Sequence, residues 1–221
     1  RMGARDGSSL ALTPFFAPLG HLSPPFCLPQ GRPAFAGMFK GFTLEDVSGQ
    51  NQVKSSVQRG IKQSIMDLYP RLEPVMKELW PKDGSMVVTK CKDHITMVVI
   101  DKIPLFFQQR DGPWMPTLRV LHQYPSMMYK VQGMRQVDKG AIKFVLRGAS
   151  IMCPGITSPG GRLEKIPVDV PVAIYAEGTE HACAVGVMTM SSDDVTKLNK
   201  GNCIDHIHFL NDGLWKTKEL A

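Results

Sequence analysis

Three basic side chains at four-residue spacing, followed at once by a glycine, are the residues of this chain best suited to hold a polyanion. Lys139, Lys143 and Arg147 would share one face of a helix, because residues four apart lie one above the other. They flank an apolar stripe at helical spacing, made of Ile142, Val145, Leu146 and Ala149. The pattern predicts a helix over 138–149 with a basic ridge beside its buried face, where it can contact phosphates.

Gly148 falls near the end of this predicted helix, where a left-handed C-cap residue is expected. The next residues predict a short buried strand over 151–153 and a turn at Pro154-Gly155. A glycine lets a phosphate or a base approach the backbone closely. The same pattern also fits a solvated helix face with an ordinary cap. As candidate RNA-binding residues we take Lys139, Lys143, Arg147, Gly148, Ala149, Ser150, Cys153, Pro154 and Gly155.

Other chemistry has little support in the sequence. Cys203, His206 and His208 have a C-x2-H-x-H spacing, but in a strand the two histidines would share one face and the cysteine the other, which is poor geometry for one zinc ion. There is no GxxxxGK[ST] or GxGxxG motif for a nucleotide. The five cysteines form no CxxC pair, and Cys91, Cys153 and Cys183 are predicted to be buried thiols. We therefore expect no catalytic residue, no metal and no cofactor.

Charge is distributed unevenly along the chain. The 221 residues carry a formal charge of +6, a mild excess that favours polyanion partners. Residues 134–165 hold six basic and two acidic side chains, whereas 166–221 hold four and eight. Apolar runs are of strand length at most, so no membrane span is expected. In residues 38–133, Arg110, Arg119 and Lys130 could form a basic patch, although scattered surface charge is the better interpretation.

The elements that must position these residues fall into two domains. In 38–133, helical periodicity predicts helices over 52–68 and 72–79, then a β-meander over 86–91, 95–100 and 105–108, and a short helix over 117–122. In 134–221, strands are expected at 170–176, 183–190 and 204–210, with a short helix that Ser191 caps and Gly201 ends. Residues 1–37, rich in proline and free of lysine, are expected to be a disordered or non-native extension; a transit peptide is the alternative.

The second domain resembles the PUA domain of pseudouridine synthases and archaeosine transglycosylases. The matching pieces, in order, are Lys139-Gly140-Ala141, Gly148-Ala149-Ser150, Met152-Cys153-Pro154-Gly155, Ala184-Val185-Gly186, Met190-Ser191, His208, Asp212 and Trp215. From Met38 to the end the chain is similar to the malignant T-cell-amplified sequence protein family. This wider likeness is carried by Leu105-Phe106-Phe107, Pro116-Thr117-Leu118-Arg119, the block Gln136 to Leu146, Ile151 to Gly155 and Leu210 to Trp215.

The resemblance implies an α+β chain with an N-terminal α/β pre-PUA domain and a C-terminal PUA mixed-β barrel. It implies a cytoplasmic, non-enzymatic factor that binds RNA and tRNA and pairs with the density-regulated protein, which carries a SUI1 domain. The pair would act at small ribosomal subunit RNA in unconventional initiation, reinitiation and tRNA recycling. The extension at 1–37 and a longer connector at 126–135 depart from the family pattern. A ribosome-biogenesis factor of similar layout, or an accessory subunit of a tRNA-modifying enzyme, remains an alternative.

Overall fold

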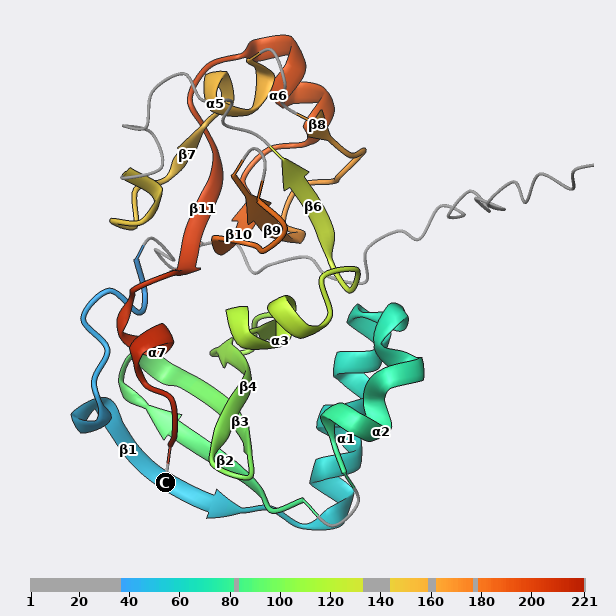
Figure 1. Ribbon diagram of the computed structural model, residues 1–221, viewed down its shortest axis with the longest axis vertical. Coiled ribbons are helices and arrows are strands. Elements are labelled where there is room, and N and C mark those ends of the chain that lie inside the picture. The colour runs from blue at the N-terminus through green and yellow to red at the C-terminus, as the bar shows by residue number, and fades with distance from the viewer. Residues whose placement is uncertain (1–36, 82–83, 133–143, 159–161, 177–178, 221) are drawn as a thin grey trace, which may run out of the picture.

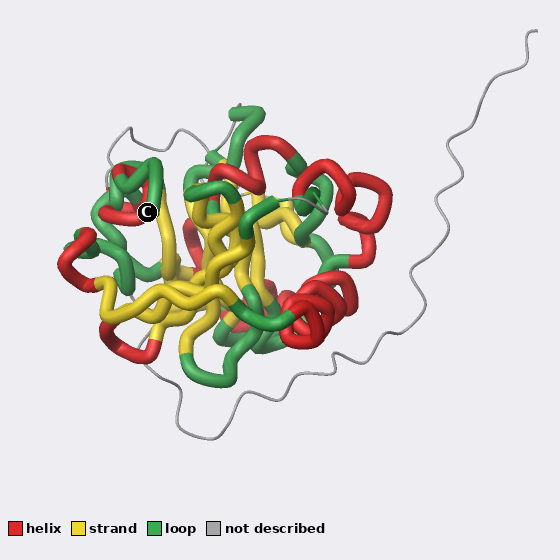
Figure 2. Tube along the Cα trace, turned by 90° about the horizontal axis from the view of Figure 1, so that it is seen from below, coloured by secondary structure: helices red, strands yellow, loops and turns green. Residues whose placement is uncertain are grey.

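The computed structural model describes residues 37–81, 84–132, 144–158, 162–176 and 179–220. They form the predicted α+β fold, in which two sheets follow one another along the long axis and helices lie around them (Figure 1). Seen along that axis, the strands occupy the middle and most helical segments lie towards the outside (Figure 2). In the described ranges, no helix combines the length and the apolar character that crossing a membrane requires.

The first sheet is antiparallel, with the order β1-β2-β3-β4-β5. Its strands are β1 (Val47–Gln52), β2 (Met86–Cys91), β3 (Ile95–Ile100), β4 (Ile103–Gln109) and β5 (Met115–Pro116). The helical segments are η1 (Leu44–Asp46), α1 (Ser55–Leu68), η2 (Pro70–Val75), α2 (Met76–Leu79), η3 (Lys92–His94) and α3 (Leu118–Gln123). The first predicted helix and the meander are confirmed. The second predicted helix is divided, because Pro70 and Pro74 favour a 3-10 segment before α2.

The second sheet has the order β7-β11-β10-β9-β6-β8. Its strands are β6 (Tyr129–Gln132), β7 (Ile151–Met152), β8 (Arg162–Leu163), β9 (Pro171–Tyr175), β10 (Ala184–Met188) and β11 (Asn202–Phe209), and its helices are α5 (Cys153–Thr157), α6 (Ser192–Leu198) and α7 (Gly213–Lys216). Ser191 caps α6 as predicted, by accepting a hydrogen bond from the Asp194 N–H. The helix ends at Asn199, in the left-handed conformation, rather than at Gly201.

Two segments cross the division that the sequence suggested after residue 133. β6 pairs in parallel with β9 and antiparallel with β8, so it is part of the second sheet although it ends at residue 132. Gly213–Leu220, at the other end of the chain, packs against the first sheet, where the Leu220 N–H donates to the Lys102 carbonyl. Neither segment carries a pattern of its own that would assign it to one domain.

The two domains share buried cores. One apolar cluster joins Phe39, Met97 and Phe107 of the first domain to Ile207 and Leu214 of the second. Another joins the α1 and α3 side of the first sheet to residues of β9 and β10. Cys91, Cys153 and Cys183 are buried free thiols, as predicted. Shared packing of this kind holds the domains in one relative orientation.

Candidate nucleic-acid interface

The end of the predicted basic helix is built around Gly148. The Gly148 N–H donates to the Val145 carbonyl at 2.9 Å, and the Ala149 N–H reaches back to the Phe144 carbonyl at 3.0 Å. Gly148 itself has φ +84°. These two bonds and the left-handed glycine form a Schellman motif, which confirms the predicted C-cap. Lys139 and Lys143 lie outside the described residues, so their part in the ridge stays a prediction.

The close approach that Gly148 permits is an approach of protein. A Cβ at Gly148 would lie 3.1 Å from the ring of Phe209 and 3.6 Å from the Cα of Gly37. The missing side chain therefore makes room for β11 and for the segment that enters the first domain. Direct contact between Gly148 and an RNA strand stays a prediction.

The segment after Gly148 exposes some of the predicted RNA-binding residues and buries one. Cys153 is fully buried in the second core, where its Sγ lies 3.3 Å from the Lys200 carbonyl. Pro154 is exposed and Gly155 is half-buried, and both belong to α5. The turn predicted at Pro154-Gly155 is wrong, because proline in the first turn of a helix loses no hydrogen bond and favours helix initiation there.

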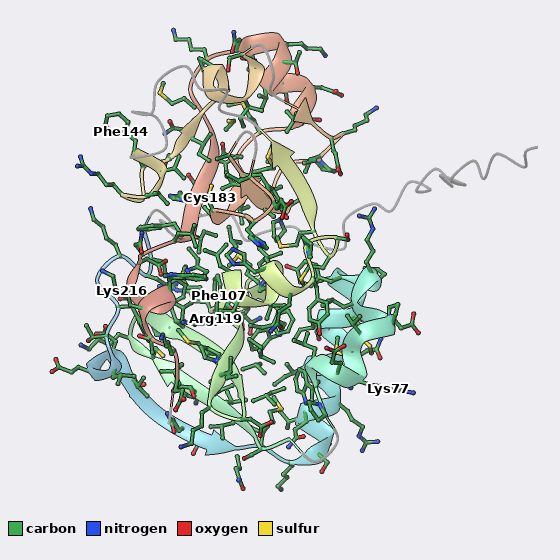
Figure 3. The ribbon with its side chains drawn as sticks, viewed as in Figure 1. Lys77, Phe107, Arg119, Phe144, Cys183 and Lys216 are labelled. Atoms are coloured by element: carbon green, nitrogen blue, oxygen red, sulfur yellow. The ribbon has the colours of Figure 1, made fainter. Side chains whose placement is uncertain are left out.

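The exposed residues from 144 to 154 form what we call the 144–154 surface. Arg147 and Ala149 are exposed, and Ser150 is half-buried. Phe144 is 61% exposed and points away from the body of the second domain (Figure 3). Met152 is 55% exposed. The Arg147 side chain is exposed to solvent, and it has no ion-pair partner among the described residues.

Phe144 and Met152 were not among the residues selected from the sequence. Phe144 lies off the apolar stripe, one position before the buried Val145, so a helical projection places its ring at the solvent. Exposed aromatic rings are the groups on which unpaired bases stack. Its position off the stripe was the signal that could have identified it.

Beneath this surface, His206 supports the packing of Gly148. Its ring stacks on that of Phe209 with centroids 5.1 Å apart and an interplanar angle of 23°. The His206 side chain is fully buried, and among the described residues no hydrogen bond reaches either ring nitrogen. Burial lowers the pKa of His206 from 6.5 to about 4, and the charge of Asp212 opposes this shift only in part. The imidazole is therefore neutral at pH 7.

Because His206 is buried and resists protonation, we expect the folded protein to lose stability in acid. Between pH 6.5 and pH 4 the unfolded state binds a proton at His206 that the folded state does not, so the unfolding free energy falls as the pH falls. Urea unfolding of the wild type and of His206→Asn at pH 7.5 and pH 4.5 measures this. The wild type should lose about 2 to 3 kcal/mol more than the variant over that interval. Equal losses would mean that His206 does not resist protonation in the folded protein.

The structure corrects the predicted placement of the two histidines on one strand face. Val185 pairs with His208 while Gly186 pairs with His206, so β11 bulges at this point. The His208 Nδ1–H donates to the Asp212 carboxylate at 2.7 Å, and the His208 ring packs edge-on against Phe39 and Phe107. The His206 ring stacks on Phe209 instead. The Cys203 thiol donates to the Ile151 carbonyl at 3.2 Å. Three side chains with separate partners make no common metal site.

Arg119 does not contribute to a basic patch. Its guanidinium donates to the carbonyls of Leu214 and Trp215, and it lies 5.4 Å from the centroid of the Trp215 ring. Burial lowers the Arg119 pKa from its ordinary value, and the charge of Asp212 opposes this. Arg119 therefore connects α3 to α7, and its role is to fix the domain junction.

Comparisons with known proteins agree with this two-domain layout. Residues 42–125 match the Pre-PUA-like domain, and residues 133–210 match the PUA domain. The chain is 50% identical over 182 residues to malignant T-cell-amplified sequence 1-A of Xenopus laevis, covering 82% of this chain and 98% of that protein. It is 49% identical over 182 residues to malignant T-cell-amplified sequence 2 of Homo sapiens, with the same coverage.

Solved structures support the fold. A hypothetical protein of Pyrococcus horikoshii superposes with a TM-score of 0.61 at 19% identity, over 77% of this chain and 99% of that one. A PUA domain protein of Aeropyrum pernix superposes with a TM-score of 0.57 at 22% identity, over 77% and 91%. At such low identity these likenesses establish the architecture alone.

Proposed function

This chain belongs to the malignant T-cell-amplified sequence family, and from that premise we propose that it is a translation factor that grips RNA with its PUA domain. PUA domains are RNA-binding domains, so RNA is the ligand class that the family favours. The observation that carries the proposal is the 144–154 surface, where an exposed aromatic ring, an exposed arginine and a glycine-capped helix end lie together. Aromatic stacking with a nearby cation suits an unpaired strand or a helix end of RNA.

The wider role follows from the family. We propose that the protein acts in the cytoplasm on the small ribosomal subunit, together with the SUI1-domain density-regulated protein, in unconventional initiation, reinitiation and tRNA recycling. The PUA domain would hold the tRNA acceptor end, and the first domain would contact ribosomal RNA or the partner. The cores that the two domains share support this proposal. They hold the two contact surfaces in one orientation, so both surfaces can bind an RNA of matching shape at the same time.

A non-enzymatic role is part of the proposal. Burial raises the pKa of the Cys91 thiol to about 11 and that of Cys183 to about 11. A raised thiol pKa is the opposite of what a nucleophilic cysteine needs. His206 and His208 are buried in the core, away from solvent. RNA binding is enough to explain the exposed groups of the 144–154 surface, and no chemical reaction has to be assumed.

Co-sedimentation tests this function. The full chain would be mixed with purified small ribosomal subunits and initiator tRNA, with and without the density-regulated partner, and the amount that sediments with the subunits would be measured. Partner-enhanced binding to mature subunits is expected. Binding to precursor subunits alone would replace the proposal with a role in ribosome biogenesis, and absence from all subunits in mild salt would overturn it.

Phe144→Ala tests the surface itself. Loss of one stacked base costs about 1 to 3 kcal/mol, so the Kd for a single-stranded RNA should rise by about fivefold to a hundredfold. Val57→Ala is the matched control, because Val57 is 47% exposed on α1 of the first domain and belongs to neither proposed RNA contact. Fluorescence anisotropy gives both constants. Unchanged affinity in a folded Phe144→Ala protein would remove the ring from the interface.

A further inference from the structure

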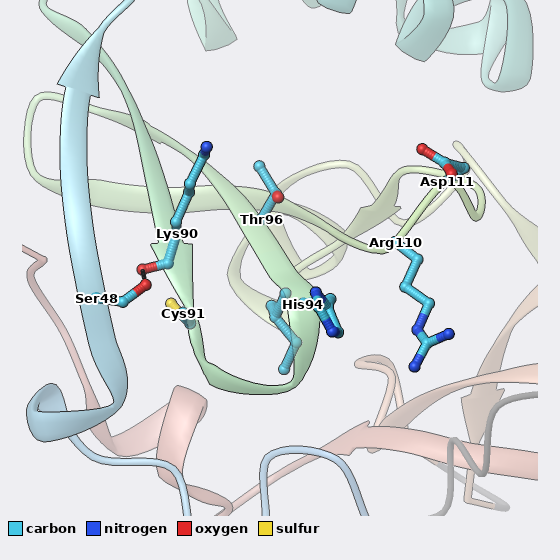
Figure 4. A pocket seen from close by; sticks show the side chains of 8 residues that line it. Ser48, Lys90, Cys91, His94, Thr96, Arg110 and Asp111 are labelled. Carbon is cyan, nitrogen blue, oxygen red and sulfur yellow. Dashed lines mark hydrogen bonds between the residues drawn. The ribbon is translucent and has the colours of Figure 1, made fainter.

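A hollow of about 540 Å³ opens on the first domain, at the end of the sheet where β2 turns into β3. Lys90 and Arg110 stand towards its two ends, and His94 and Thr96 lie between them (Figure 4). Five elements contribute to its wall: β1, β2, η3, β3 and the turn that follows β4. The hollow is separate from the 144–154 surface.

The face of the sheet explains why this hollow exists. Val88, Val98 and Phe106 are buried against the α1 and η2 residues Ile65 and Leu72. Two positions further along the same strands, side chains return to the same face.

Those positions carry polar residues. Lys90 is paired with Thr96, and Thr96 with Gln108, in one row across three strands. The covering helices do not extend over this row, and Figure 4 shows them at a distance from the lining side chains. The helix-covered face of the first sheet is therefore apolar in its middle, where α1 and η2 pack on it. At the end that the helices leave uncovered, the face is polar and concave.

Two turns bring the remaining side chains to this end. Asp93 and His94 have φ of 57° and 58°, and Arg110 has φ of 52°. The Arg110 N–H donates to the His94 carbonyl at 2.9 Å. The backbones that carry His94 and Arg110 are thus joined, and both residues occupy the left-handed region that non-glycine residues seldom adopt.

The two cations of the hollow are open to solvent. Lys90 and Arg110 are exposed, and neither makes an ion pair within the described ranges. Lys92, by contrast, is paired with Asp46 at 2.7 Å. Asp111 contributes one carboxylate to the rim. Two separated cations with a histidine and a hydroxyl between them suit successive phosphates of a strand better than one small anion.

The two surfaces are close along the chain. Gly37 lies against Gly148, and Ser48 lines the hollow. Ten residues, 38–47, lie between Gly37 and Ser48. The eleven Cα-to-Cα steps span at most about 40 Å even in a fully extended chain. The turn at 37–41 and η1 shorten the path further.

We propose that this hollow is a second RNA contact, which binds the sugar-phosphate backbone through Lys90 and Arg110 without reading bases. It goes beyond the PUA surface, and it relies on the proposed function only in taking RNA as the ligand. An RNA that reaches both contacts would be held at two points. The first domain would then bind phosphates through its two cations, and the second domain would stack an RNA base on the Phe144 ring.

The test uses the full chain and a single-stranded oligouridylate. Lys90→Glu/Arg110→Glu is compared with Lys77→Glu/Lys218→Glu, which makes the same charge change at exposed lysines outside the hollow. The hollow variant should bind at least tenfold more weakly at low salt. Its slope of log Kd against log salt should fall by about 1.4, the release expected for two phosphates of a single strand. The control should change by less than about twofold.

The outcomes separate the two proposals. Equal weakening in both double variants, or none in the hollow variant, overturns the second contact. Retained RNA affinity together with lost binding to polyglutamate also overturns it, and would indicate an acidic protein partner. If the hollow variant weakens binding while Phe144→Ala does not, the hollow stands and the PUA surface fails.

Discussion

Gly213→Ala is expected to destabilise the protein by about 3 kcal/mol or more. A Cβ at Gly213 would overlap the carbonyl oxygen of Phe42 and press on the rest of that peptide unit. The same glycine donates its N–H to the Phe39 carbonyl at 2.8 Å, and Phe39 is fully buried. The backbone cannot retreat without withdrawing Phe39 from the core shared by the two domains. Urea unfolding at pH 7 measures the loss.

Gly60→Ala is the control for this substitution. Gly60 lies within α1, and a Cβ there would meet nothing within 4 Å. Alanine favours a helix interior over glycine by about 0.5 to 1 kcal/mol, so this variant should gain stability. Similar unfolding midpoints for Gly213→Ala and the wild type would contradict the close packing of residues 37–42 on α7.

Asp212→Ala should cost about 3 kcal/mol. The Asp212 carboxylate is buried and accepts three hydrogen bonds: from the His208 Nδ1–H at 2.7 Å, from the Phe209 N–H at 2.9 Å and from the Trp215 N–H at 2.8 Å. The last of these caps α7, which typically contributes about 1 kcal/mol. The other two partners are buried, and leaving them unsatisfied adds about 1 to 3 kcal/mol.

Ser191→Ala separates the cap from the network. Ser191 caps α6 through the Asp194 N–H, but that contact is exposed. Its loss should cost about 1 kcal/mol or less. Chemical unfolding of both variants provides the comparison. If Asp212→Ala costs no more than Ser191→Ala, the buried network contributes nothing beyond a helix cap.

The sequence predicted the parts of the fold that depend on local periodicity. α1, the β2–β4 meander and the Gly148 cap each carry their own pattern, of helical spacing, of alternation or of a glycine after a helix. β6 and the edge strand β1 were not predicted. β1 reads Val-Ser-Gly-Gln-Asn-Gln, which has no apolar alternation, and it becomes a strand because β2 offers it a partner. Pairing of this kind is decided by tertiary contacts.

The candidate site was predictable to a similar degree. The position of Arg147 and the exposure of Phe144 follow from the helical period. The replacement of the predicted Pro154-Gly155 turn by α5 depends on where β7 ends, and the separation of His206 from His208 depends on a bulge. A one-residue irregularity reverses the side-chain faces of a strand, and no feature of the sequence marks where it falls.

The claim that the PUA domain grips RNA through the 144–154 surface is tested most directly by ultraviolet crosslinking of the intact chain to RNA, with mass spectrometry of the linked peptides. The account predicts nucleotide adducts on peptides that contain Phe144 to Pro154, and the loss of these adducts in Phe144→Ala. Crosslinks that avoid this surface, on a folded protein that still binds RNA, would contradict it.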